Sequence, residues 1–391
     1  MSQPAGAPVV IVGSGLGGFT VAREFRKLDK TTPLVVLSRD HAGFYSKPML
    51  SNALAGNKSA AALVMKPADK MALETNASVR ANAHVARIDT AAQTVELEGG
   101  EVLIYRDLVL ALGADPLRLP LEGDAADAVL SVNDLDDYAR FADMLVGVKT
   151  VAILGGGLIG CEFANDLLHR GITATVIDLA DRPLSRLLPE AASALLRKRL
   201  EAAGVRFRFN VAASAVHRAD AGAGSGFQLL LSDGSRVTAD LVLSAIGLRP
   251  RTALAHAAGI EVNRGIVTNR ALATSAPHVF AVGDCAEVAG HNLPYVMPLM
   301  QQARALAATL AGTPTLVVYP AMPVLVKTPA CPTVVCPPPM AAAGEWQVSH
   351  TEDSCDARFV GPDGSLLGFA LLGTATTQKQ ALAAQVKGLL G

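Results

Sequence analysis

A glycine-rich turn between a strand and a helix constrains the fold of this chain more than any other feature. Residues 151–162 read VAILGGGLIGCE, in which an apolar run meets Gly155, Gly157 and Gly160 before a helical pattern begins. A pyrophosphate needs backbone N–H groups at a helix N-terminus with no side chain in the way, so this spacing predicts a dinucleotide site. The next strand ends in Asp178, about 20 residues further on, where a carboxylate accepts hydrogen bonds from ribose hydroxyls. An acid at this position favours NAD over NADP.

The same pattern occurs near the N-terminus, in PVVIVGSGLGGF over residues 8–19. A single glycine motif of this kind is weak evidence for a dinucleotide site, because glycines also occur in tight turns and where helices pack closely. Two copies at equivalent strand–turn–helix junctions predict that the chain binds two dinucleotides. The candidate binding residues of this turn are Gly13, Ser14, Gly15, Leu16 and Gly18.

The strand after the first turn departs from the usual pattern. Its end reads LSRD, so Ser38 and Arg39 stand where a ribose-binding acid is expected. Either Asp40 substitutes for that acid, or Ser38 and backbone groups do. Val85 lies where a returning strand would offer backbone groups to an adenine. Ser38, Arg39 and Val85 are therefore candidate residues for the first dinucleotide.

A third signal is FAVGDCAE, in which an apolar strand ends at Gly283 and Asp284. Gly-Asp alone is a common turn. Behind two dinucleotide units, however, this carboxylate is placed to reach a ribityl hydroxyl of a flavin. Gly247 closes a strand of similar form, DLVLSAIG, and is a further candidate. Lys47, in FYSKPML, is either a solvated surface lysine or a binding residue, and its position alone favours the former.

These patterns predict an α/β fold with two Rossmann-like dinucleotide-binding domains, one for FAD and one for NAD, and a small α+β C-terminal domain. We expect the FAD-binding domain over residues 1–115 and 240–312 and the NAD-binding domain over 116–239. The C-terminal domain is expected over 313–391, with a closing helix over 376–390. It would cover the open face of the flavin or carry an interface.

Composition limits the kinds of partner. The 391 residues carry a formal net charge of −1, so no overall field recruits nucleic acid. The longest uncharged interval, 305–326, is interrupted by glycine and prolines, and no charged leader precedes an apolar stretch. Five cysteines, odd in number and scattered, argue against a disulfide framework. We expect a cytoplasmic protein without membrane insertion and without a metal site.

Taken together, the motifs resemble the pyridine nucleotide–disulfide oxidoreductase-fold flavoproteins. Within that group the chain is most similar to the bacterial NADH-dependent reductases of small iron proteins, those of rubredoxin above all. The stretches that carry the resemblance are IVGSGLGG, FYSKPML, RDLVLALGA, LGGGLIGCEFANDL, LVLSAIGLRPRT, FAVGDCAE with YVMPLM, and VKTPACP. They cover nearly the whole chain.

The resemblance implies roles that spacing alone does not provide. It implies FAD and NADH as cofactors, with Lys47 beside flavin N5 and paired with Glu162. It also brings Lys327, Val296 and Asp284 to the flavin. A buried lysine is costly unless a carboxylate neutralises it, which agrees with such a pair. The implied reaction is electron transfer from NADH through FAD to rubredoxin, one electron at a time, in supply of an alkane hydroxylase system.

Three alternatives remain open at this level. The acceptor could be a ferredoxin of an oxygenase system rather than rubredoxin. A disulfide or peroxide reductase of the same fold needs a redox-active cysteine, and only Cys331 and Cys336 have a suggestive spacing. We interpret these two as packing or surface cysteines, because they fall in a proline-rich extended segment. A non-enzymatic interaction protein is the third alternative, and a turnover assay separates it from the others.

Overall fold

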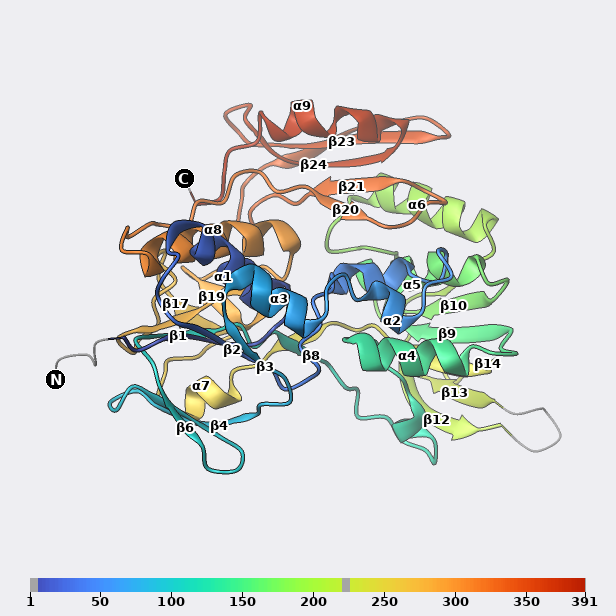
Figure 1. Ribbon diagram of the computed structural model, residues 1–391. Helices are drawn as coiled ribbons and strands as arrows, with labels where there is room; N and C mark the ends of the chain where they lie inside the picture. Colours follow the sequence, from blue (N-terminus) through green and yellow to red (C-terminus); the bar gives the residue numbers. More distant parts are fainter. Residues whose placement is uncertain (1–5, 220–225, 391) are drawn as a thin grey trace.

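Two parallel sheets and one antiparallel sheet form the body of the protein (Figure 1). The computed structural model describes residues 6–219 and 226–390. The first sheet, in the order β18-β7-β1-β2-β3, comprises β1 (Val9–Val12), β2 (Leu34–Leu37), β3 (Ser78–Arg80), β7 (Asp107–Leu110) and β18 (Val279–Ala281). The second, in the order β11-β10-β9-β15, comprises β9 (Thr150–Leu154), β10 (Thr173–Ile177), β11 (Arg206–Arg208) and β15 (Leu241–Ser244). The expected α/β class with two similar units is confirmed.

The two units repeat one local arrangement. In the first, β1 leads through a glycine turn into α1 (Leu16–Leu28) and on to β2, and in the second β9 leads into α5 (Leu158–Leu168) and on to β10. All four residues of β1 are buried, as strands of a parallel sheet covered on both faces require. Because both helices begin at the carboxyl ends of their strands, both turns lie at the edge where ligands of such sheets bind.

The second crossing between the units lies later than the predicted boundary at residue 240. β15 belongs to the second sheet, where Leu241 pairs in parallel with Val151 of β9. Its counterpart β7 pairs in the same way with β1, so each of these apolar strands completes its own unit. The chain crosses back only after Ser244, through β16 (Leu248–Pro250), which pairs antiparallel with β8 (Ala114–Pro116).

A segment that belongs to the first unit in the sequence packs into the core of the second unit. The predicted domain boundaries, which follow the order of the chain, did not anticipate this packing. The 3₁₀ helix η1 (Lys47–Asn52) leads to α2 (Ala60–Leu63), which lies beside α4 (Leu135–Met144) (Figure 1). Leu54 and Leu63 are buried in the same hydrophobic cluster as the second sheet. The segment that begins at Lys47 is thus attached to the NAD half predicted from the sequence.

Smaller elements complete the two halves. Two three-stranded antiparallel sheets are formed by β4 (Val85–Asp89), β5 (Thr94–Leu97) and β6 (Val102–Ile104), and by β12 (Ala213–Arg218), β13 (Phe227–Leu231) and β14 (Arg236–Ala239). β17 (Ile266–Thr268) pairs with β19 (Ala286–Val288). The remaining helical elements are α3 (Ala68–Thr75), η2 (Ala126–Ala128), α6 (Glu190–Ala202), α7 (Ala253–Ala257), η3 (Gly283–Cys285) and α8 (Val296–Leu310).

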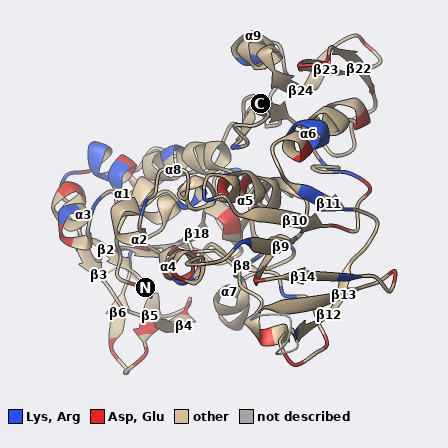
Figure 2. Cartoon of the chain, turned by 90° about the vertical axis from the view of Figure 1, so that its right-hand side faces the viewer, with Lys and Arg blue, Asp and Glu red and all other residues tan. Residues whose placement is uncertain are grey.

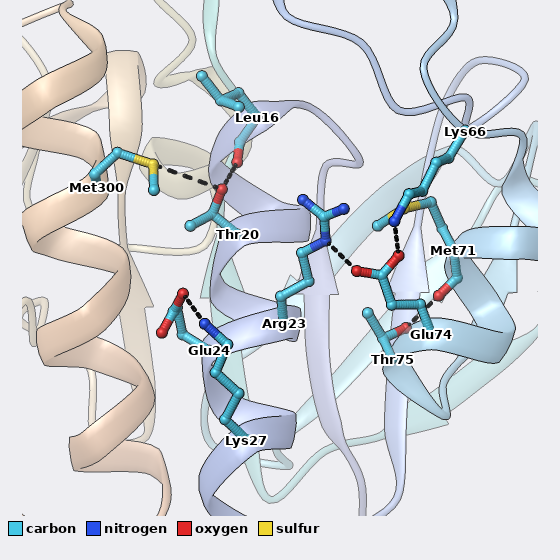
Figure 3. A network of polar contacts seen from close by, with 10 residues as sticks. All are labelled: Leu16, Thr20, Arg23, Glu24, Lys27, Lys66, Met71, Glu74, Thr75 and Met300. Atoms are coloured by element: carbon cyan, nitrogen blue, oxygen red, sulfur yellow. Dashed lines mark hydrogen bonds and ion pairs between the residues drawn. The ribbon is translucent and has the colours of Figure 1, made fainter.

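Polar contacts hold α1 between α8 and α3 (Figure 3). On one side the Thr20 hydroxyl donates to the Leu16 carbonyl, at 2.6 Å, and lies 4.0 Å from the Met300 sulfur of α8. On the other side Glu74 of α3 pairs with Arg23 at 2.9 Å and with Lys66. These ion pairs are partly exposed, so they orient α1 more than they stabilise it.

The C-terminal sheet packs on α6 of the second unit. In the order β20-β21-β24-β23-β22, it comprises β20 (Val324–Val326), β21 (Thr333–Cys336), β22 (Glu345–His350), β23 (Ser354–Val360) and β24 (Leu366–Gly373). One face joins the hydrophobic cluster of the second unit. At the edge of this contact, basic residues of α6 (Figure 2) form ion pairs, Lys198 with Glu352 at 2.9 Å and Arg199 with Asp353.

The chain end differs from the expected helix over 376–390. The structure has a 3₁₀ turn, η4 (Thr374–Gln378), and a short helix, α9 (Lys379–Ala383). The helix stops early because the following residues pair with another segment, the Leu389 N–H donating to Tyr319 and the Tyr319 N–H to Leu390. Across the described ranges, no helix combines the length and the apolar character needed to cross a membrane.

Candidate functional site

A continuous cleft of about 1830 Å³ joins the two glycine turns. Pockets for drug-sized ligands hold roughly 300–1,000 Å³, so this cleft accommodates something larger. Most of the residues predicted from the sequence line it: Gly13, Ser14, Gly15, Leu16, Ser38, Arg39, Lys47, Val85, Gly155, Gly157, Glu162, Asp178, Gly247, Gly283, Asp284, Val296 and Lys327. The two exceptions are Gly18 and Gly160.

Each glycine of the first turn is required for a different physical reason. Gly13 has φ +116°, and a Cβ there would collide with the Ala111 carbonyl. A Cβ on Gly18 would collide with the carbonyl of Gly13, so this residue serves close packing of helix on turn rather than ligand contact. Gly15 differs, because a Cβ there would meet nothing within 4 Å. The middle glycine therefore keeps open a space that the folded chain itself does not use.

The second turn repeats this distribution. Gly155 has φ +103°, and a Cβ would lie 2.7 Å from the Ala245 carbonyl oxygen, while one on Gly160 would collide with Gly155. A Cβ on Gly157 would again meet nothing within 4 Å.

Both helices expose uncapped N-termini to this space. Gly15 and Gly157 are the N-cap residues of α1 and α5, and neither helix has a side-chain cap or an acid in its first turn. Helix N-termini of this kind attract phosphate. The residues present therefore fit two dinucleotides.

Ser38 and Asp40, the two alternatives for the first ribose, lie in one network. The Ser38 hydroxyl donates to Asp40 Oδ1 at 2.6 Å and lies 2.5 Å from the Ser14 hydroxyl of the glycine turn. Asp40 Oδ1 also accepts from the Ala42 N–H at 2.9 Å. The carboxylate two residues later than usual is thus connected through serines to the turn, and all three polar side chains line the cleft.

Asp178 directly follows β10 and lies beside the second turn. Its Oδ2 accepts from the Gly156 N–H and its Oδ1 from the Ala180 N–H, the latter at 2.7 Å. These bonds hold the carboxylate at the cleft wall beside the open position of Gly157.

Asp178→Arg should reverse the nucleotide preference. It should weaken NADH binding about tenfold or more, because bonds to a charged acceptor contribute about 1.5–3 kcal/mol, and it should improve NADPH use, because the carboxylate no longer repels a 2′-phosphate. The measurement is kcat/KM with each nucleotide. Asp178→Asn, which keeps one acceptor oxygen for the turn, separates loss of charge from loss of the turn's hydrogen bonds. An unchanged NADH:NADPH ratio in the arginine variant would remove Asp178 from the ribose site.

Lys47 begins η1 and lines the cleft half-buried, so it is not the solvated surface lysine that its position alone favoured. Burial lowers the pKa of Lys47. Attraction to Asp284 opposes that shift, repulsion by Arg251 adds to it, and Asp134 and Asp115 raise the pKa by smaller amounts. Among the charged groups around Lys47, Asp284, the carboxylate predicted to reach a ribityl chain, therefore acts on it most strongly.

Glu162 is paired with Lys327, and the expected pair with Lys47 is not formed. Glu162 is 0% exposed and accepts from both nitrogens of Lys327, from the backbone N–H at 2.9 Å and from the side-chain Nζ. A third donor is the Ser51 hydroxyl, at 2.5 Å. The physical reason is the position of the C-terminal domain, which brings residue 327 onto α5 and places its backbone and side chain against the same carboxylate.

Sequence reasoning missed two other polar residues on the same face of α5. Asn165 and Asp166 are 3% and 2% exposed. Asn165 Oδ1 accepts from the Ala330 N–H at 3.0 Å, and Asp166 accepts from Leu54 and Ala55 N–H groups at 2.9 Å each. The signal was present in CEFANDLL, where polar residues at i, i+3 and i+4 share one face of an otherwise apolar helix.

Cys331 and Cys336 do not form a redox pair in this geometry. All five are buried free thiols. Cys331 belongs to the cluster shared with the second unit, while Cys336 belongs to a separate cluster on the opposite face of the C-terminal sheet. Burial raises the pKa of Cys331, and raises that of Cys336 to about 11, which disfavours the reactive thiolate. Over the described ranges, no group of three or more His, Cys, Asp or Glu residues could hold a metal ion.

Comparison with known proteins gives two family matches. Residues 7–308 match the family described as pyridine nucleotide-disulphide oxidoreductase. Residues 316–386 match a family described as rubredoxin binding C-terminal domain.

Full-length relatives agree with these matches. The chain is 51% identical over 385 residues to the rubredoxin-NAD(+) reductase of Alcanivorax borkumensis, covering 98% of this chain and 99% of that protein. It is 46% identical to the protein of the same name from Acinetobacter baylyi, covering 96% of each. Among solved structures, a ferredoxin reductase from Rhodopseudomonas palustris superposes with a TM-score of 0.87 at 26% identity, covering 97% of this chain and 95% of that one.

Proposed function

The chain belongs to the pyridine nucleotide-disulphide oxidoreductase family, and on that premise we propose that it is a flavoprotein reductase that passes electrons from NADH through FAD to rubredoxin. One observation carries the proposal. Two helix N-termini, each with an unfilled middle-glycine position, open into the same cleft. A protein that binds two dinucleotides in one cleft can bring their reactive rings together.

FAD would be held by the first unit. The Gly15 turn would receive the pyrophosphate, the Ser38–Asp40 network the ribose, and Asp284 the ribityl chain. NADH would be held by the Gly157 turn and Asp178 of the second unit. When bound, FAD supplies the exchange between a two-electron hydride and single electrons. The protein would contribute by positioning the two cofactors, because hydride transfer between bound reactants depends on their separation and alignment.

Lys47 and the Glu162–Lys327 pair would act where the two cofactors meet. Lys47 would supply a half-buried amine on the FAD side, and its protonated form would stabilise negative charge that develops next to it. Lys327 extends from the C-terminal domain to the same cleft, and Glu162 neutralises its charge. The glutamate therefore joins the C-terminal domain to the helix that begins at the NADH site.

The rim of the cleft favours a small protein as the electron acceptor. Met297 and Leu325 line the cleft and are 43% and 59% exposed, so apolar side chains lie at the solvent-accessible part of the cleft, where a protein partner could contact them. Rubredoxin is the acceptor named for the relatives at 51% and 46% identity, and the C-terminal match points the same way. The likeness to a ferredoxin reductase supports ferredoxin as the second candidate.

Steady-state NADH oxidation by the purified yellow protein tests this function. Rubredoxin and a [2Fe–2S] ferredoxin are compared as acceptors, with oxygen and a disulfide as controls. We expect fast turnover with rubredoxin and little with the other three. Preference for ferredoxin would change the partner, and preference for oxygen or a disulfide would overturn the reductase assignment.

We propose the cytoplasm as the compartment, because the five cysteines are all buried free thiols, as in proteins kept reduced. Supply of electrons to an alkane hydroxylase stays a prediction from the family resemblance.

A further inference from the structure

The segment that carries Lys47 is attached to the helix that begins at the other nucleotide site. Asp166 of α5 accepts from the Leu54 N–H through Oδ2 and from the Ala55 N–H through Oδ1, both at 2.9 Å. These amides lie two and three residues after the end of η1, whose first residue is Lys47. One carboxylate on the NAD side therefore holds the end of the turn that presents the lysine on the FAD side.

The attachment is buried and depends on the carboxylate. Asp166 is 2% exposed, and both of its oxygens are used. Burial raises the pKa of Asp166, and the two amide hydrogen bonds oppose that shift. Buried hydrogen bonds to a charged acceptor are among the stronger ones in proteins, and a donor left without its partner pays the full desolvation cost.

Apolar packing and the Ser51–Glu162 hydrogen bond hold the same segment independently of this carboxylate. Ala53 and Leu54 are each 2% exposed, within the cluster of the second unit. Loss of the carboxylate should therefore leave the segment in place but free to shift by a fraction of an ångström. A shift of that size matters for a group that must lie close to reacting atoms and matters little for folding.

We propose that Asp166 is a positioning residue for electron transfer, which sets the location of Lys47 in the cleft through the backbone of residues 54 and 55. The inference rests on the proposed function, because it gives Lys47 a role beside the flavin. Asp166 itself does not line the cleft and touches no ligand site. Its effect therefore passes through Lys47.

The test compares Asp166→Asn with a control variant, Asp240→Asn. Asp240 also accepts from two consecutive backbone amides, those of Lys149 and Thr150, at 2.9 and 2.8 Å, both through Oδ2, and it lies partly buried outside the cleft lining. We expect Asp166→Asn to lower the limiting rate of flavin reduction by NADH about tenfold, since small misplacements of catalytic groups carry costs of this order or more. The NADH dissociation constant should stay unchanged, and the control variant should reduce at the wild-type rate.

A double-mutant cycle separates positioning from general damage. If Asp166 acts through Lys47, then Asp166→Asn should have no further effect in a Lys47→Met background, where there is no amine left to position. Additive losses in the double variant, or a wild-type rate in the single one, would overturn the proposal. If Asp166→Asn does not yield a flavoprotein, Asp166→Ser, which leaves room for a water at the two amides, takes its place in the cycle.

Hydrogen exchange provides a readout that does not depend on activity. In Asp166→Asn, the amides of residues 54 and 55 should exchange at least about tenfold faster, while exchange at residues 149 and 150 should stay as in the wild type. Unchanged exchange at 54 and 55 would remove the proposed attachment. If NADH fails to reduce even the wild-type flavin, the proposed function fails, and the exchange result still reports on the attachment alone.

Discussion

Gly157→Ala should fold normally, retain FAD and bind NADH about tenfold to a hundredfold more weakly, whereas Gly15→Ala should fail to retain FAD. Both residues have extended backbone angles that alanine adopts without strain, φ −75° and −65°, and a Cβ at either position meets nothing in the free protein. The methyl group instead occupies the space into which the phosphates would come. Overpacking a tight contact costs about 1–3 kcal/mol, which sets this range.

Gly160, the third glycine of the second turn, provides the matched control for this prediction. In Gly160→Ala the new Cβ collides with the Gly155 carbonyl, so the loss should be of stability, about 3 kcal/mol, and not of NADH affinity alone. Urea denaturation gives the stability, and NADH titration of the oxidised holoprotein gives the affinity. A Gly157→Ala protein with wild-type NADH affinity would mean that the second turn is a packing device without a nucleotide.

Removing the carboxylate of Glu162 should destabilise the protein and slow flavin reduction, and the same substitution experiments identify which lysine is its partner. Glu162→Ala leaves Lys327 without its counter-charge and removes the closer of the two acceptors of the Ser51 hydroxyl. Breaking a buried ion pair costs about 3–5 kcal/mol, and we expect about 3, because the Lys327 side chain is 21% exposed. Lys327→Met should cost at least as much, since it strands a fully buried charge.

Lys47→Met tests whether Lys47, rather than Lys327, is the partner of Glu162. The lysine pays a burial cost that lowers its pKa, so its removal should leave stability unchanged or slightly higher, while flavin reduction slows with FAD still bound. Denaturation midpoints and stopped-flow reduction are measured on all three variants. A surface control, Glu201→Gln in the exposed pair with Arg197, should change stability by less than about 0.5 kcal/mol. Coupling of Glu162 to Lys47 rather than to Lys327 in a double-mutant cycle would contradict the observed pairing.

Much of the fold could be predicted because its signals are local. A strand, three spaced glycines and a helical pattern lie within a dozen residues, and each turn occurs where the pattern placed it. The predicted domain boundary at residue 240 lies too early, because the local pattern does not show which sheet the next strand joins. The apolar run of β15 has the same form as β7, and only pairing with Val151 shows that it completes the second sheet.

Positions on the cleft wall were predictable where a local motif fixes them, and contacts between distant segments were not. Gly15, Gly157 and Asp178 follow from their places in a motif. The pairing of Glu162 does not, because the glutamate and Lys327 lie 165 residues apart, and either of two lysines satisfies the charge argument. Asp166 was overlooked because its partners are backbone amides, 112 and 111 residues away, which have no side-chain signature.

The sequence by itself determined that this chain has two similar strand–turn–helix units, each with a glycine-rich turn, since the order of strand, turn and helix encodes these features locally. The tertiary structure alone decided which lysine Glu162 neutralises, how Lys47 is held, and that Cys331 and Cys336 face opposite sides of a sheet. The physical reason is that a buried charge takes whichever donor the packed domains bring to it. That choice depends on how α5, η1 and the C-terminal sheet meet, and no short stretch of the chain records it.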